Sequence, residues 1–376
     1  MAERGIAQLP RVLTLLSFSL SNMRFWTLDP LNPSLVRLSA AHFKDQGFIM
    51  SKMVSHARPL YAVAVMLAVL SSSAVAGNTR SATWVELSPA TSPTPRAVSA
   101  MAYDPVSKKV VMFGGFNNTI YLNDTWTWDG TTWTEETTSL APSPRTSAMM
   151  AYDRASRKLV LFGGYDGTQF LGDTWLWDGA TSTWTQANPA SSPSALAGAM
   201  LFTDPKNEHA DLYGGFDGQF YQVNTWQWVG GTWQLLQPST SPFARGWAVV
   251  GLDLARKIVI LSGGVGDLRT DNTWTWDGVN WTQQQPATAL PKIFDTAAAF
   301  DPTFHVVVVF GGDAGNGALN TSWAWTGTNW LLGQPAQSPP ARELHGMAYD
   351  FASKQLLVFG GEANSFLNDT WSLVSQ

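Results

Sequence analysis

The stretch Val110-Val111-Met112-Phe113-Gly114-Gly115 is an apolar run that is closed by a pair of glycines. The same pattern recurs five more times along the chain. The other copies end at Gly164, Gly215, Gly264, Gly312 and Gly361. A short apolar run bounded by glycine is typical of a buried β-strand that ends in a turn. Six copies at a spacing of about 49 residues indicate a repeat architecture.

Two sets of tryptophans keep the register of the glycine pairs. One set follows each pair by about eleven residues, in a D/N-T-W-like setting: Trp126, Trp175, Trp226, Trp274, Trp323 and Trp371. The other set lies 30 residues before the first glycine of each pair: Trp84, Trp133, Trp184, Trp233, Trp281 and Trp330. The first copy shows four strand-like runs, at 97–103, 110–113, 124–128 and 132–136. A repeat of this length with four strands predicts one propeller blade per copy.

The first and last copies complement each other. The sixth copy stops in its third strand, around Trp371, and an isolated fourth strand around Trp84 precedes the first copy. Closing the ring leaves no open interface between repeats. We therefore expect an all-β, six-bladed β-propeller with four antiparallel strands per blade, in which the N-terminal strand near Trp84 completes the last blade.

These features resemble the kelch-repeat β-propeller family over residues 81–376. The resemblance rests on the glycine pair, the D-T-W-x-W strand, the fourth-strand Trp, and the proline-containing lead-ins before Arg96 and Arg145. Departures occur at Ser262, Thr321 and Leu373, each in a single copy. The resemblance implies a scaffold shared by protein-binding modules, bacterial secreted kelch-repeat proteins and carbohydrate-active enzymes such as galactose oxidase. The fold therefore leaves the function open.

The composition limits the chemistry of the chain. Its 376 residues include 19 Trp, 32 Gly and no Cys, and the formal net charge is -5. Without cysteine, thiolate metal sites and the cysteine–tyrosine cofactor of galactose oxidase are excluded. The negative charge gives no general attraction for nucleic acid. We recognise no metal-ligand cluster and no phosphate-binding loop in the sequence, and we expect no cofactor and no metal.

Residues 50–76 have the parts of a secretory signal peptide. A lead with His56 and Arg58 precedes the apolar run 60–70, and an A-x-A sequence ends at Ala76. About eleven apolar residues are too few to span a bilayer. We therefore expect cleavage near residue 77, and a secreted or periplasmic product that does not insert in the membrane and is monomeric.

A signal peptide stands at the start of a chain, whereas this one begins at about residue 50. We interpret residues 1–49 as an upstream extension from a misassigned start, with translation beginning at Met50 or Met53. The alternative is a genuine N-terminal extension with a short internal anchor. Residues 77–376 then form the propeller domain.

Arginine begins four of the six inner strands. These residues are Arg96, Arg145, Arg245 and Arg342, while Leu196 and Ile293 stand in the other two copies. The loops after the glycine pairs supply carboxylates at Asp166, Asp217, Asp267, Asp313 and Glu362. The two sets either pair as a structural ring, because partly buried arginines need counter-charges, or contribute to a ligand site.

Residues that differ from the repeat consensus are the more specific site candidates, because the common fold does not require them. Trp247 is the one propeller tryptophan outside the register, and Asp295 stands at the same position of the next copy. Glu343 and His345 lie at the start of the sixth copy. Together they predict an aromatic platform, two carboxylates and an imidazole around one mouth, a mixture suited to a sugar or an acidic ligand.

Three functions agree with these residues. The first is a binding module that holds a glycan or a protein at the long-loop face, over the central channel. The second is a carbohydrate-active enzyme, either a sugar epimerase or mutarotase that uses Glu343 and His345 as acid–base groups, or a sialidase-like protein. The third is a structural surface protein, which predicts no pocket at the mouth.

N-terminal sequencing of the exported protein tests the signal peptide. We expect the first residue near Gly77, because signal peptidase cleaves after the A-x-A sequence. A mature protein that begins before residue 50 would contradict this expectation.

Overall fold

The computed structural model describes residues 25–28, 36–39 and 82–375. The chain divides into two units, Met1–Thr79 and Arg80–Gln376. In the first unit, strands β1 (Phe25–Leu28) and β2 (Val36–Ser39) form an antiparallel pair. The predicted signal peptide and start codons lie outside the described residues, so the expectations about them stay predictions.

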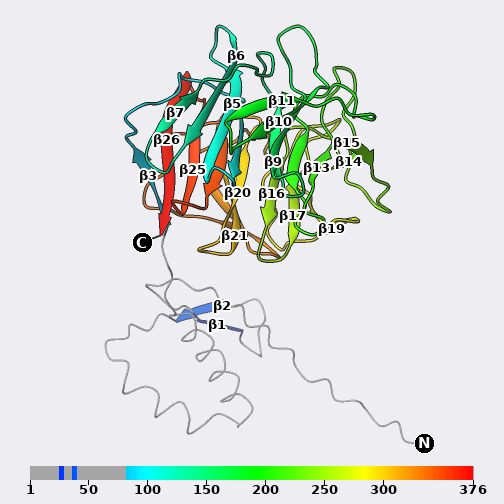
Figure 1. Cartoon of the computed structure of the whole chain (residues 1–376). Coiled ribbons are helices and arrows are strands. Elements are labelled where there is room, and N and C mark those ends of the chain that lie inside the picture. Colours follow the sequence, from blue (N-terminus) through cyan, green and yellow to red (C-terminus); the bar gives the residue numbers. More distant parts are fainter. Residues whose placement is uncertain (1–24, 29–35, 40–81, 376) are drawn as a thin grey trace, which may run out of the picture. The chain divides into compact units, whose positions relative to one another are not determined.

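In the second unit, the described residues form six antiparallel four-stranded sheets, which are the blades of a propeller (Figure 1). Blade 1 contains β4 (Ala100–Asp104), β5 (Lys109–Phe116), β6 (Tyr121–Trp128) and β7 (Trp133–Glu136). Blade 2 contains β8 (Met149–Asp153), β9 (Lys158–Phe162), β10 (Thr174–Asp178) and β11 (Thr183–Gln186). Blade 3 contains β12 (Met200–Thr203), β13 (Ala210–Tyr213), β14 (Thr225–Val229) and β15 (Thr232–Leu235).

The second half of the ring repeats this order. Blade 4 contains β16 (Val249–Asp253), β17 (Ile258–Ser262), β18 (Thr273–Trp276) and β19 (Trp281–Gln284). Blade 5 contains β20 (Ala297–Asp301), β21 (Val306–Phe310), β22 (Ser322–Trp325) and β23 (Trp330–Leu332). Blade 6 contains β24 (Gly346–Asp350), β25 (Gln355–Glu362), β26 (Phe366–Ser375) and β3 (Ala82–Leu87).

Blade 6 closes the ring with strands from the two ends of the propeller. Strand β3 pairs antiparallel with β26, and Trp84 stands opposite Leu373 (Figure 1). This pairing confirms the predicted closure. It also confirms the all-β, six-bladed architecture with four strands per blade.

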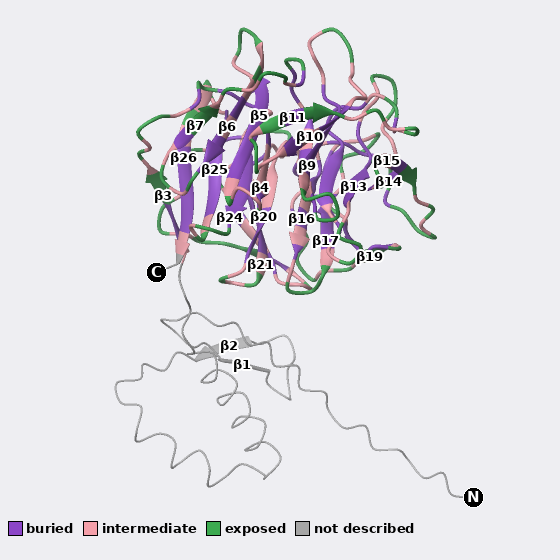
Figure 2. Cartoon of the chain, in the orientation of Figure 1, coloured by how far each residue is buried: buried purple, intermediate pink, exposed green. Residues whose placement is uncertain are grey.

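Each fourth-strand tryptophan ties its blade to the preceding one. Its indole Nε1–H donates to a hydroxyl on the third strand of that blade, at 2.9–3.0 Å. The pairs are Trp84 with Ser322, Trp133 with Thr370, Trp184 with Thr125, Trp233 with Thr174, Trp281 with Thr225, and Trp330 with Thr273. The bond satisfies a polar atom on a ring that is otherwise buried in apolar surroundings. Six apolar clusters, one at each blade interface, surround these bonds, and Figure 2 shows the buried strands in purple.

The glycine pairs let neighbouring blades approach each other. A Cβ added at Gly114 would lie 2.8 Å from the carbonyl oxygen of Arg145 in the next blade. The N–H of Gly115 donates to that same oxygen at 2.9 Å. Both glycines have positive φ, 67° and 103°, which a residue with a side chain rarely adopts. The diglycine is therefore a contact between blades as well as the end of a strand.

Two substitutions in β3, the strand that closes the ring, test how much this strand contributes to the stability of the propeller. Trp84→Ala removes a fully buried ring and its hydrogen bond to Ser322, so we expect a loss of about 3–5 kcal/mol in the free energy of unfolding. Val85→Ser on the same strand changes a side chain that is 39% exposed, and we expect less than about 0.5 kcal/mol. Denaturant unfolding measures both variants. Deletion of residues 81–87 with no change in melting temperature would contradict the role of this strand.

Candidate binding site at the mouth of the central channel

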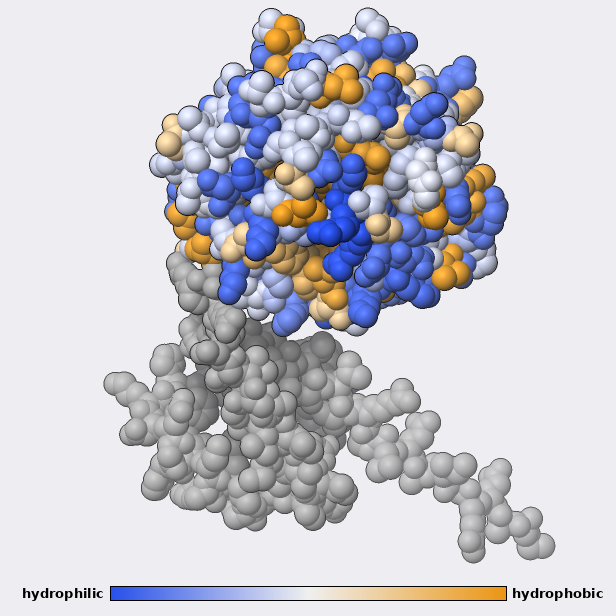
Figure 3. Space-filling view, in the orientation of Figure 1, coloured by the Kyte–Doolittle hydropathy of each residue, from blue (hydrophilic) through white to orange (hydrophobic). Residues whose placement is uncertain are grey.

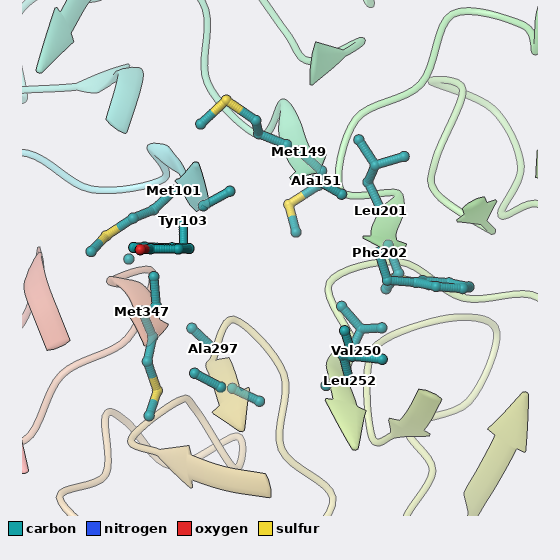
Figure 4. Close-up of a pocket in the computed structure, with 18 of the residues that line it drawn as sticks. Met101, Tyr103, Met149, Ala151, Leu201, Phe202, Val250, Leu252, Ala297 and Met347 are labelled. Atoms are coloured by element: carbon teal, nitrogen blue, oxygen red, sulfur yellow. The ribbon is translucent and has the colours of Figure 1, made fainter. Parts of the chain in front are cut away.

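The inner strands of the six blades surround a cavity of about 320 Å³ on the propeller axis. Figure 4 shows apolar side chains from different blades arranged around this space, among them Met101, Met149, Leu201, Val250 and Met347. A cavity of this size and lining is comparable to small ligand pockets. A pocket is therefore present on the axis, which the structural-protein hypothesis does not predict.

A ring of backbone hydrogen bonds frames the loop-face end of the cavity. One residue from each blade has left-handed φ, between 49° and 61°: Val98, Ser147, Gly198, Trp247, Asp295 and Leu344. The N–H of each donates to the carbonyl of its counterpart in the preceding blade, at 2.7–3.2 Å, and the sixth bond closes the ring. We call these residues the mouth ring. Five of the six carry a side chain in a conformation that is uncommon for them, so the ring compensates local strain.

Trp247 fits into the mouth ring because its neighbour is a glycine. A Cβ at Gly198 would collide with the indole of Trp247, so the absence of a side chain in blade 3 makes room for the ring in blade 4. The indole lines the cavity and is half-buried. Trp247 therefore lies at the predicted mouth and is not sealed between blades.

Aromatic side chains on the loops of blades 1 to 3 continue from Trp247. Successive ring centroids lie 4.9–6.4 Å apart along the series Phe116, Tyr121, Tyr165, Phe170, Phe216, Tyr221 and Trp247, which we call the aromatic arc. All seven rings are half-buried. Our sequence analysis missed the arc, although the signal is visible. An aromatic residue follows the glycine pair in these three copies, and a second stands five residues later.

Blades 5 and 6 place carboxylates where blades 1 to 3 place the aromatic arc. Asp313 and Glu362 follow their glycine pairs and bridge to Phe294 and Glu343. Among the described residues, neither these two carboxylates nor those of Asp295 and Glu343 have a basic partner within ion-pair distance. The mouth is therefore asymmetric: the residue after the glycine pair is aromatic in blades 1 to 3 and acidic in blades 5 and 6. The separation is incomplete, because Asp166 and Asp217 stand beside the aromatic arc and Phe366 of blade 6 lies 5.9 Å from Phe116.

Burial and neighbouring charges raise the pKa of Asp295 to about 7. Desolvation is the largest cause, and the nearby carboxylates of Glu343 and Asp313 add to it, while Arg269 acts in the opposite direction. Burial likewise raises the pKa of Glu343, with contributions from Asp313 and Glu362. Both shifts disfavour the charged form of the carboxyl groups.

The four arginines do not lie in the mouth, which corrects their expected placement. Arg96, Arg145, Arg245 and Arg342 are at most 1% exposed. Three of them bind the aspartate of the D-T-W sequence in their own blade, at 2.6–2.7 Å: Arg96 with Asp124, Arg145 with Asp173, and Arg342 with Asp369. Arg245 instead donates to Asn272 at 3.0 Å. The pairs support the structural alternative, with partners other than the predicted glycine-loop acids.

The arginine–aspartate pairs leave a signal in the sequence, because some copies of the repeat replace both residues. Where blade 3 has Leu196 in place of arginine, Asn224 replaces the aspartate, and blade 5 has Ile293 together with Thr321. A buried charge without its partner is costly, which accounts for the paired exchanges in blades 3 and 5. Blade 4 is intermediate, because it keeps Arg245 and pairs it with Asn272.

His345 lines the cavity together with Trp247 and Asp295, but its side chain is buried. Its ring is 6% exposed and lies edge-on to Phe310 at 5.6 Å, inside the interface between blades 5 and 6. Neither ring nitrogen has a hydrogen-bond partner. Burial, with the charge of Arg342, lowers the pKa of His345 to about 3, so the imidazole is neutral. His345 is therefore a buried, neutral part of the wall of the cavity that Asp295 also lines.

The raised pKa of Asp295 predicts a pH-dependent stability. The unfolded carboxyl has a pKa of about 3.9, so between about pH 4 and pH 7 the folded protein binds the additional proton, and its stability falls as pH rises. Asp295→Asn removes the titrating group, and therefore its pH-dependent contribution to stability. Asparagine also tolerates the left-handed φ of this position. We expect the variant to gain stability over the wild type as pH rises from 4 to 8. A difference in melting temperature that is constant over this range would contradict the assignment.

The described residues hold no group of three His, Asp or Glu side chains that could bind a metal ion. Within the same part of the chain, no helix has the length and hydrophobicity needed to cross a membrane. No curated protein matches the sequence significantly. A family model, the KLHDC2/KLHL20/DRC7 Kelch-repeats domain, matches residues 68–264, which is more than half of the chain. Together with the six blades, this match shows that the chain belongs to the Kelch-repeat family.

Proposed function

We propose that this protein is a binding module that holds a polypeptide ligand at the mouth of the central channel. Kelch propellers commonly bind proteins. The observation that carries the proposal is the asymmetry of the mouth ring, where Trp247 and Asp295 stand side by side in adjacent blades and line the cavity. Neither residue is required by the repeat, because other blades have Val98 or Ser147 at this position.

The physical chemistry of the mouth suits a protein ligand. Tryptophan and tyrosine are enriched among the residues that dominate binding energy in protein interfaces, because one rigid ring buries a large apolar area. Trp247 and Tyr221 lie 6.4 Å apart and are both half-buried, so a ligand can still cover them. The carboxylates of Asp313 and Glu362 at the mouth add charged groups that would orient the ligand.

A glycan ligand is the second candidate, and the aromatic arc favours it, because flat apolar rings also pack against sugar rings. The enzymatic alternatives have less support. His345 is buried and its pKa is lowered to about 3, so its imidazole is poorly suited to the acid–base role predicted with Glu343. The arginines that suggested a sialidase-like site are held by Asp124, Asp173, Asp369 and Asn272.

We also propose that the propeller is exported as a monomer, on the strength of the signal-like segment 50–76. An exported domain would meet its ligand outside the cytoplasm. Fractionation of cells that produce the full chain, together with sizing of the recovered protein, tests both parts of this proposal.

Selection from a random peptide display library, with a glycan array in parallel, tests the binding function. We expect peptides to bind the full-length protein, and Trp247→Ser to weaken binding about 30-fold, as for the loss of a central hot-spot ring. Serine already stands at this ring position in blade 2, so the backbone should tolerate the change. Ser147→Ala serves as the matched control and should bind as the wild type does.

Two outcomes would count against the proposal. Peptides whose affinity is the same for the wild type and Trp247→Ser would place the site elsewhere. Ligands found only on the glycan array, and lost in Trp247→Ser, would favour the second candidate.

A further inference from the structure

Four large apolar side chains are exposed on the loop face of blades 3 and 4. Phe220 is 65% exposed, Val223 45%, Phe243 74% and Leu268 83%. We call these residues the apolar patch. Figure 3 shows that hydrophobic residues, in orange, are scattered among hydrophilic ones over the face of the propeller that it draws. Contiguous exposed apolar residues that the fold does not bury are typical of interaction surfaces.

Backbone hydrogen bonds hold the three segments of the patch side by side. The N–H of Arg245 donates to the carbonyl of Gln222 at 3.4 Å, which joins the crossing between blades 3 and 4 to the loop of blade 3. Gly246 and Val265 exchange two bonds, at 2.8 and 3.0 Å, which join the same crossing to the loop of blade 4. The patch therefore borders Trp247, which follows in the same crossing.

The patch departs from the repeat at positions where other blades carry polar residues. Phe243 stands where blade 2 has Ser143, and the hydroxyl of Ser143 accepts a hydrogen bond from Arg145 at 2.8 Å. Leu268 stands four residues after its glycine pair, where blades 1 and 2 have Thr119 and Thr168. The common fold therefore does not require large apolar side chains at these two positions.

Carboxylates surround the patch and suggest the charge of the partner. Asp267 and Asp271 flank Leu268 in the loop of blade 4 and are exposed. Burial raises the pKa of Tyr221, and the charges of Asp295 and Asp267 add to the shift. Within the loops 216–223 and 265–272 the one basic side chain is Arg269, whose guanidinium lies 4.5 Å above the ring of Phe294.

We propose that the apolar patch docks a polypeptide segment that combines apolar with basic side chains. Its apolar side chains pack on Phe243 and Leu268, and its lysines or arginines lie near the exposed carboxylates of Asp267 and Asp271. Complementary charge speeds encounter and fixes the orientation of the segment, while the apolar contacts supply most of the affinity. This inference rests on the proposed protein-binding function and adds the chemical class of the partner.

Two model peptides of equal apolar content test the inference. One alternates lysine with leucine and the other glutamate with leucine. Fluorescence anisotropy measures their binding to the full-length protein at about 50 mM and about 300 mM NaCl, where charge screening differs. We expect the lysine peptide to bind, more weakly at the higher salt concentration, and the glutamate peptide to bind at least about tenfold more weakly.

A double variant, Phe243→Ser with Leu268→Thr, places residues from the corresponding positions of other blades in the patch. We expect it to bind the lysine peptide at least about tenfold more weakly while its melting temperature stays unchanged. Leu140→Thr is the matched control. Leu140 is 52% exposed in the crossing between blades 1 and 2, and Thr240 stands at its equivalent position in blade 4. This control should bind as the wild type does.

Three results would overturn the inference: no binding of the lysine peptide, equal binding of both peptides, or unchanged binding in the double variant. The display experiment separates the two proposals. Selected peptides whose binding requires Trp247 but that carry no basic residues would contradict the proposed class of partner. They would still support the binding function. A library that yields no binding peptide would contradict the peptide-binding function itself.

Discussion

The hydrogen bond from a buried indole to a hydroxyl in the preceding blade is the contact on which the propeller depends. The tryptophan contributes a large apolar ring to the blade interface, but its N–H needs an acceptor once it is buried. A threonine or serine on the adjacent third strand supplies this acceptor in all six interfaces. Because Trp84 supplies the sixth indole, the ring is complete only when β3 joins blade 6.

The need to pair buried polar groups also explains why the arginines of the lead-in segments are unavailable for binding. Three of the buried arginines are neutralised by aspartates within their own blades, and those aspartates also accept the indole N–H of Trp126, Trp175 and Trp371. Each such group holds a lead-in segment against a third strand. The side chains of the mouth ring can differ from blade to blade, because backbone hydrogen bonds hold the ring together. These side chains are therefore available for binding.

The asymmetry of the mouth arises from sequence differences between the copies at the residue that follows each glycine pair. An aromatic residue after the glycine pair in blades 1 to 3 becomes Val265, Asp313 and Glu362 in blades 4 to 6. The residue after the glycine pair is therefore aromatic on one side of the mouth and acidic on the other. Burial, with these carboxylates, raises the pKa of Asp295 and of Glu343. A symmetric scaffold thus carries an asymmetric surface, and the apolar patch lies next to Trp247, where the two kinds of side chain meet.

The spacing of glycine pairs and tryptophans was enough to determine the blades, their strands and the closure by Trp84, because these depend on contacts that repeat at a constant interval. It was also enough to single out Trp247 and Asp295 as departures from the pattern. Only the tertiary structure decided which candidates reach the mouth, because that depends on the neighbouring blade. Gly198 leaves space for Trp247, whereas Phe310 helps to enclose His345 and aspartates bind Arg96, Arg145 and Arg342.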